Sequence, residues 1–256
     1  MTRPLSAPVP PAAGGLWRWS RRVGLLLAAL VAGFLALVIH PQPLFAYSLQ
    51  RGNLVLHARA PFPAQAVPIA DEVLRRVSRS PLYDRAHTHD VFLCDTPALY
   101  GLFALWGYRS GGVTHTQFTG NAFIRPFNIE RNVVFGRMGQ VKQAERSLAY
   151  FIAHEVTHAM SAHHFGRRPF ARLAAFQTEG YADYVAFARE VDLARGRAAL
   201  LADAPEMSPR RSGLYARYEL LVAYLLRHRG LSVDQLLEQP MSQKAVEREL
   251  VDATDL

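Results

Sequence analysis

The chain is poor in two residues that often decide how a protein is interpreted, cysteine and lysine. Its 256 residues include one cysteine, Cys94, so no disulfide can form within the chain. A single cysteine neither requires nor excludes an oxidising compartment. Only Lys142 and Lys244 are lysines among 29 basic residues. Arginine therefore carries nearly all of the positive charge.

Acidic residues are missing from the first 22 positions, which contain four arginines, Arg3, Arg18, Arg21 and Arg22. Half of the formal net charge of +8 therefore lies in this short segment. The rest of the chain has no basic stripe interleaved with aromatic residues, the pattern that is typical of nucleic-acid binding. We therefore expect no nucleic-acid partner.

Charge is also absent from Val23 to Ile39, a run of 17 mostly apolar residues. A helix of this length rises about 25 Å, near the lower limit for crossing a lipid bilayer. The arginines before it favour a cytoplasmic N-terminus. We expect residues 1–22 to form a cytoplasmic tail and residues 23–39 a single transmembrane anchor. The remainder then lies outside the cytoplasm, which for a bacterial inner-membrane protein is the periplasm.

A cleaved signal peptide is the alternative for this segment. The apolar run is long for a signal peptide, and Leu44 stands where a cleavage site needs a small residue. We therefore favour an uncleaved anchor. Both interpretations place the following domain outside the cytoplasm.

Beyond residue 40, the sequence predicts strands first and then helices. Residues 40–60 are expected to connect the anchor to a domain at 61–256 and to contain a first strand. From Ala144 onwards the pattern is mainly helical. This order predicts an α+β fold in which a small mixed sheet packs on a mainly helical half. The expected elements before Ala144 are strands at 53–60, 89–95, 121–125 and 132–136, and a helix within 64–80.

The stretch AYFIAHEVTHAMSAHHFG, residues 149–166, suggests a metal site. His154 and His158 are four residues apart, so on a helix they share one face and can bind one ion. Glu155 lies beside them, where its carboxylate can take a proton from metal-bound water. The apolar residues before His154 predict a buried helix that would hold both ligands rigidly. An ordinary helix with two histidines is the alternative.

A catalytic zinc ion needs a third protein ligand and an open fourth position. His164 is one candidate, because it occupies the last position of the metzincin pattern His-Glu-x-x-His-x-x-Gly-x-x-His. Ser161 stands where metzincins have the glycine that breaks the helix. We therefore expect the helix to continue to Gly166, with His164 at its end.

Glu179 is the second candidate, in the stretch FQTEGYADYVAFARE on a helix expected to begin near Pro169. Asp183 follows four residues later on the same face, and Gly180 would allow a close approach between helices. This stretch resembles the second helix of gluzincins, the thermolysin-like and aminopeptidase-like zinc peptidases. The resemblance implies that Glu179 is the third zinc ligand. It also implies that Asp183 hydrogen-bonds a ligand histidine.

The resemblance covers residues 90–230 in layout. A predicted helix at Tyr215–Gly230 is similar to one in aminopeptidase-type gluzincins, where a tyrosine stabilises the oxyanion. Tyr215 matches that tyrosine, but Tyr218 replaces the glycine that follows it, and simple packing is the alternative role. Gluzincins also pair the peptide with an edge strand above the zinc. Residues 120–125 lie at a similar distance before the zinc helix.

These features together imply a zincin-like catalytic domain that hydrolyses peptide bonds, more as an endopeptidase than as an aminopeptidase. The expected cofactor is Zn²⁺, the expected base is Glu155, and the expected partner is a peptide or protein substrate. One alternative is a non-catalytic, zinc-stabilised domain that binds a cell-envelope partner. Another is a metzincin-like peptidase that uses His164. The sequence indicates neither the substrate nor the oligomeric state.

Overall fold

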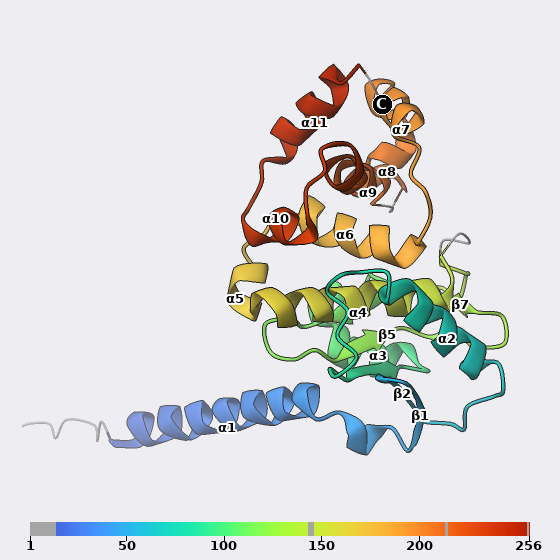
Figure 1. Cartoon of the computed structure of the whole chain (residues 1–256). Coiled ribbons are helices and arrows are strands. Elements are labelled where there is room, and N and C mark those ends of the chain that lie inside the picture. The colour runs from blue at the N-terminus through green and yellow to red at the C-terminus, as the bar shows by residue number, and fades with distance from the viewer. Residues whose placement is uncertain (1–13, 143–145, 213–214, 255) are drawn as a thin grey trace, which may run out of the picture. The chain divides into compact units, whose positions relative to one another are not determined.

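The structure is a computed structural model that describes residues 14–142, 146–212, 215–254 and 256. The chain divides into two compact units, Met1–His40 and Pro41–Leu256. Helix α1 (Gly14–Ile39) belongs to the first unit, and the second unit contains the sheet and the other helices (Figure 1). Residues 1–13 of the expected cytoplasmic tail lie outside the described residues.

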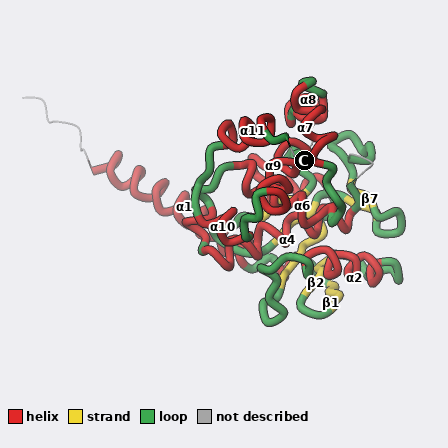
Figure 2. The backbone as a smooth tube through the Cα atoms, turned by 45° about the horizontal axis from the view of Figure 1, so that its top comes forward, coloured by secondary structure: helices red, strands yellow, loops and turns green. Residues whose placement is uncertain are grey.

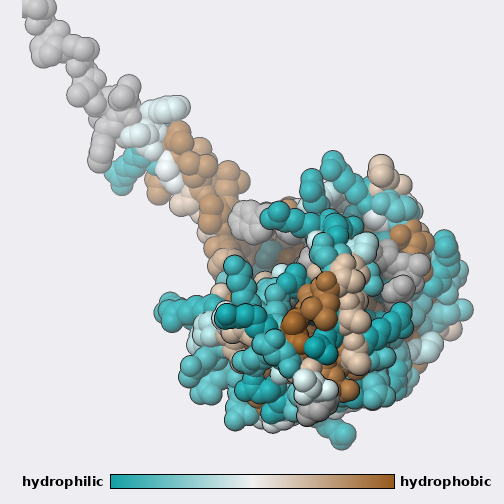
Figure 3. Space-filling model, turned by 90° about the horizontal axis from the view of Figure 1, so that it is seen from above, coloured by the Kyte–Doolittle hydropathy of each residue, from teal (hydrophilic) through white to brown (hydrophobic). Residues whose placement is uncertain are grey.

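Helix α1 is apolar enough to cross a membrane. Its segment Trp19–Ile39 has 21 residues and a mean hydropathy of 2.5. Hydrophobic side chains cover it, whereas the face of the second unit seen in Figure 3 is mostly hydrophilic. A signal sequence near the N-terminus shares these properties. The helix therefore fits both forms of membrane targeting that the sequence suggests.

The second unit contains a mixed five-stranded sheet with the strand order β1-β2-β3-β5-β4. The β2–β3 and β3–β5 pairs are parallel, and the two outer pairs are antiparallel. Two further short strands form a separate antiparallel pair. The strands are β1 (Tyr47–Arg51), β2 (Leu54–Ala58), β3 (His89–Leu93), β4 (Gly112–Thr114), β5 (Ala122–Ile124), β6 (Phe127–Asn128) and β7 (Val133–Val134).

The sheet differs from the prediction in two places. The strands expected at 121–125 and 132–136 are present as β5 and β7, but β7 pairs with β6 instead of joining the main sheet. The stretch 120–125, which was expected to form the edge above the metal, is internal. The edge strand is β4, whose three residues, beginning with glycine, are too few to show a strand pattern.

Alternation along the strands gives the sheet two apolar faces. Val91 and Leu93 of β3 belong to the main core with α2 and α4. Phe92 points the other way and stacks on Phe123, with ring centroids 5.4 Å apart. Phe123 in turn stacks on Phe103 at 4.3 Å. This aromatic layer fixes β5, and with it the edge strand β4.

Helices cover the sheet and form the rest of the unit, and α4 lies between the sheet and α6 (Figures 1 and 2). A π-helical turn, Tyr224–His228, continues α9. Short 3-10 turns occur at Gln42–Leu44, Leu105–Gly107 and Pro205–Met207. The helices after α1 are α2 (Ala66–Val77), α3 (Pro97–Ala104), α4 (Leu148–Phe165), α5 (Arg167–Phe170), α6 (Ala175–Phe187), α7 (Leu193–Leu201), α8 (Pro209–Ser212), α9 (Ala216–Ala223), α10 (Val233–Glu238) and α11 (Gln243–Asp252).

Helix α4 is buried over most of its length and runs from a serine cap to a glycine stop. The Ser147 side chain accepts a hydrogen bond from the Tyr150 N–H, which satisfies a free donor at the helix start. The helix passes through the buried Ser161 without a break, as predicted. It ends at Gly166, whose φ of +83° suits glycine.

The second helix begins later than predicted, at Ala175 instead of near Pro169. Pro169 belongs to the short helix α5, where proline is tolerated in the first turn. The close helix approach expected at Gly180 is confirmed. A Cβ at this position would lie 2.5 Å from the backbone oxygen of Tyr218, so α6 and α9 pack backbone to backbone here.

Candidate metal centre

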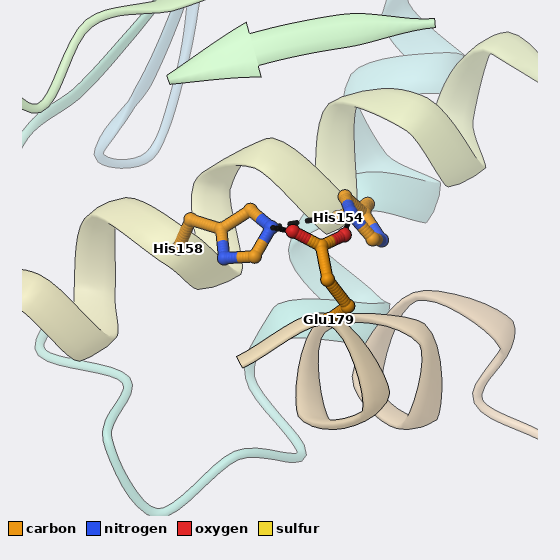
Figure 4. A group of neighbouring side chains, drawn as sticks. All are labelled: His154, His158 and Glu179. Atoms are coloured by element: carbon orange, nitrogen blue, oxygen red, sulfur yellow. Dashed lines mark hydrogen bonds and ion pairs between the residues drawn. The ribbon is translucent and has the colours of Figure 1, made fainter. Parts of the chain in front are cut away.

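Three side chains from two helices meet in a pocket between α4, α6 and β4. His154 and His158 project from α4 toward Glu179 on α6 (Figure 4). The two Nε2 atoms are 3.2 Å apart. Glu179 places Oε2 3.3 Å from His154 Nε2 and Oε1 3.6 Å from His158 Nε2. This group could hold a metal ion.

The protonation states of Glu179 and His158 suit ligand chemistry, whereas His154 must release a proton before it can bind a metal. Burial alone would raise the pKa of Glu179, but attraction to His158 and contact with His154 outweigh it and lower the pKa to about 2. Burial lowers the pKa of His158 to about 4. An ionised carboxylate and a neutral imidazole are the forms that bind metals.

His154 is held from behind by a buried carboxylate. Asp183 is fully buried, and its Oδ1 lies 2.8 Å from His154 Nδ1. Arg146 donates to the other carboxylate oxygen at 3.1 Å, and the Tyr150 hydroxyl donates to Oδ1. Contacts with Asp183 and Glu179 overcome the effect of burial and raise the pKa of His154 to about 10. Asp183 therefore turns Nε2 toward the metal position, the orientation that metal-binding histidines require.

Glu155 lies beside the group but is not part of it. Its side chain is buried, and Oε2 accepts a hydrogen bond of 2.8 Å from the Thr114 hydroxyl. Burial raises the pKa of Glu155 to about 7, against the opposing effects of His154 and Thr114. The carboxyl group can therefore take up and release a proton near neutral pH.

Strand β4 lies directly against Glu155. A Cβ on Gly112 would lie 2.6 Å from the Glu155 Cγ, closer than carbon atoms can pack. Glycine at this position lets the edge strand approach the carboxylate. The sequence did not indicate Gly112 or Thr114, because the signal for both is their position on a strand that only the folded sheet reveals.

Tyr215 lies at the wall of the same pocket, immediately before α9. Its ring lies nearly parallel to that of His154, with centroids 6.4 Å apart, and stacks on Tyr218 at 5.6 Å. Burial raises the pKa of the Tyr215 phenol. Its hydroxyl therefore stays protonated at neutral pH and can donate a hydrogen bond.

His164 is not part of the group. It lies at the end of α4, where its Nε2 is 3.1 Å from Asp234 Oδ1. Both side chains are about half exposed or more, at 48% and 67%. The intact helix through Ser161 points His164 away from the other two histidines. The structure thus brings Glu179, and not His164, to His154 and His158.

A pocket of about 780 Å³ opens over the group. One wall is the edge strand β4 with the preceding Gly111, and another is the α5 region with Phe170 and Leu173. A third part is basic, with Arg109, Lys142 and Arg146.

Comparisons with known proteins do not assign this site. No known family matches the chain, and no curated protein or solved structure does so either. The function must therefore be argued from the residues of the pocket and their geometry.

Proposed function

We propose that the chain is a zinc metallopeptidase of the gluzincin type, with a zincin-like fold and zinc bound by His154, His158 and Glu179. The separations of 3.2, 3.3 and 3.6 Å between the three pairs of ligand atoms support this proposal most directly. Tetrahedral ligands on bonds of about 2.0–2.1 Å lie roughly 3.3–3.4 Å apart. Two histidines and one glutamate also form a donor set of catalytic zinc, with the fourth position open to water.

In this proposal, Glu155 is the general base and later the acid. When bound, zinc supplies acidity to a water molecule and polarises the peptide carbonyl. Glu155 accepts the proton of that water and passes it to the leaving amine, which a pKa of about 7 permits in both directions. Thr114 holds the carboxylate in place, and the protonated Tyr215 hydroxyl can donate to the developing oxyanion.

The peptide is proposed to bind along β4. An edge strand has unpaired N–H and C=O groups on its outer side, and an extended peptide can add to them as a further strand. In this proposal β4, and not residues 120–125, has the substrate-binding role of the gluzincin edge strand. Among the described residues that line the pocket, two are acidic, Glu155 and Glu179. Both are committed to the reaction, so neither remains to bind a free amino terminus, and we favour an endopeptidase over an aminopeptidase.

We also propose that α1 is an uncleaved anchor and that the Pro41–Leu256 unit works outside the cytoplasm. The uncharged run Val23–Ile39 and the four arginines that precede it in sequence support this orientation.

Peptide hydrolysis by the full-length chain in non-ionic detergent tests the proposal. A mixture of proteome-derived peptides would be incubated with the protein and analysed by mass spectrometry. We expect new peptide ends that disappear after chelation and return when zinc is added back. A zinc-loaded protein that cleaves no peptide in the mixture would contradict the proposal and favour a non-catalytic zinc domain.

A further inference from the structure

The basic part of the pocket is not used by the proposed reaction. Arg109, Lys142 and Arg146 line it, whereas the acids among the described lining residues are Glu155 and Glu179. These acids serve proton transfer and metal binding in the proposed mechanism. The described lining therefore has a surplus of positive charge, which bound zinc would increase.

Arg146 is buried, with 5% of its surface exposed. Its guanidinium pairs with one oxygen of the Asp183 carboxylate, and the other oxygen lies 2.8 Å from His154 Nδ1. Among the described residues, the buried Nε of Arg146 has no hydrogen-bond partner. The guanidinium carbon lies 6.0 Å from the ring centre of Tyr215, on the pocket wall. This guanidinium is therefore only partly satisfied.

Lys142 is half-buried, and its Nζ donates to the backbone oxygen of Arg109 at 2.8 Å. Burial, followed by repulsion from Arg125 and Arg146, lowers its pKa. Arg125 is 2% exposed and donates to the Ser110 backbone oxygen at 3.2 Å. Among the described residues, no carboxylate forms an ion pair with Lys142 or Arg125. Such grouped cations are stabilised when an anion joins them.

We propose that this basic part of the pocket binds a carboxylate of the substrate, so that the protein selects acidic peptides. The carboxylate belongs either to an aspartate or glutamate side chain near the cleaved bond or to the peptide C-terminus. Lys142 and Arg109 supply the accessible positive charge, and Arg146 supplies a fixed guanidinium beside Tyr215. This inference depends on the proposed peptidase function for its substrate class, but it concerns different residues.

Charge reversal at the two lysines provides the first test. Full-length wild type, Lys142→Glu and Lys244→Glu would each be incubated with the proteome-derived peptide mixture. Lys244 is exposed on α11 and makes the same change in net charge, so it is the matched control. We expect acidic residues to be enriched around the cleavage sites of wild type and Lys244→Glu, and not of Lys142→Glu. Lys142→Gln, which leaves no new charge in the pocket, should weaken the enrichment.

Binding provides a second readout that does not require turnover. A fluorescent peptide taken from a cleaved or acidic sequence would be titrated against full-length Glu155→Gln by anisotropy. Two comparison peptides would be titrated in the same way. In one, each glutamate is changed to glutamine, and in the other, the C-terminus is amidated. Loss of one charge-assisted hydrogen bond should weaken binding by about tenfold to a hundredfold. The glutamine peptide reports on side chains, and the amidated peptide reports on the C-terminus.

The two tests separate this inference from the function on which it rests. Cleavage without any preference for acidic peptides, and equal binding of all three peptides, would overturn the inference and leave the peptidase proposal intact. Selective binding of the carboxylate-bearing peptide, without cleavage by the zinc-loaded wild type, would support the basic carboxylate site and contradict the peptidase proposal. If the protein cleaves no peptide in the mixture and binds none of the three test peptides, both are wrong.

Discussion

At the scale of single residues, the site depends on carboxylates in contrasting surroundings. Asp183 is buried, and its carboxylate contacts Arg146, Tyr150 and His154. These contacts hold it against the His154 ring. Glu179 faces two histidines and has a lowered pKa, as a metal ligand needs. Glu155 is buried with one hydroxyl donor and has a raised pKa, as a proton carrier needs. Similar carboxylates thus acquire different roles from their neighbours.

The identity of the third ligand gives a direct prediction. Glu179→Ala should lose bound zinc, because only two ligands remain in the group. His164→Ala should keep it, because His164 contacts Asp234 and not the other two histidines. Metal analysis of the two purified full-length proteins measures this. If His164→Ala loses the metal and Glu179→Ala keeps it, the metal site is not the one described here.

Asp183 should affect metal affinity without binding the metal. Asp183→Asn removes the charge that orients His154, and we expect zinc affinity to fall roughly tenfold to a hundredfold. Competition with a coloured chelator measures the affinity, and thermal melting checks that the protein is folded. Asp234→Asn is the control, since it changes another aspartate that contacts a histidine, at an exposed position. Equal affinity of the two variants would remove Asp183 from the metal site.

The residues of the site differ in how far the sequence could predict them. The i, i+4 spacing of His154 and His158 predicted that they share one face of α4. The same spacing predicted that Glu179 and Asp183 share one face of α6. Thr114 contacts Glu155 across 41 positions of sequence. Arg146 contacts Asp183 across 37. Helical periodicity does not report such contacts, because they depend on how separate elements pack.

At the scale of elements, the close packing of β4 on α4 decides where Glu155, the proposed general base, lies. Gly112 allows the strand to approach Glu155, and Thr114 holds the carboxylate. The sequence predicted α4 and the strands β2 and β3 well because their apolar patterns are long. It missed β1, β4 and the helix α3 and placed the start of α6 too early. Three residues of β4 are too short for a pattern, and Pro169 marks α5 and not α6.

Gly112→Ala should separate catalysis from metal binding. Its Cβ would lie 2.6 Å from the Glu155 Cγ, so either the strand or the carboxylate must move. A displacement of about 1 Å at a catalytic group can lower the rate roughly a hundredfold. Zinc content should stay unchanged, because the ligands lie on α4 and α6.

Gly120→Ala is the matched control for this prediction. The nearest atom to its added Cβ would be the Ala159 Cβ at 3.8 Å, an ordinary contact. Peptide-cleavage rates of the two variants, measured at equal zinc content, give the comparison. Equal rates would show that the packing of β4 against Glu155 has no part in catalysis.

At the scale of the whole molecule, an apolar helix precedes an α+β unit that holds the complete candidate site. The sequence predicted this order and the α+β class, since the change from strand patterns to helical patterns near residue 144 is clear. The assignment of strands to two separate sheets was not predictable, because it depends on contacts between distant segments. The orientation of α1 across a membrane remains a prediction from its flanking charges.

A reporter at the C-terminus should be active only outside the cytoplasm. The arginines before Val23 favour retention of the N-terminus in the cytoplasm, so the Pro41–Leu256 unit should be exported. Alkaline phosphatase, which needs disulfides to be active, and a cytoplasmic fluorescent protein would each be fused after Leu256. Bright fluorescence with inactive phosphatase would reverse the orientation. An immunoblot of the same cells shows whether the anchor is cleaved, by the length of the mature chain.

The most direct measurement of the central claim is peptide hydrolysis by full-length Glu155→Gln beside wild type at equal zinc content. Glutamine is nearly the same size as glutamate but cannot accept a proton. The variant should fold and bind zinc as wild type does, and the base function alone should cost about a hundredfold to ten-thousandfold in rate. Cleavage of the same peptides at the wild-type rate by zinc-loaded Glu155→Gln would contradict the account.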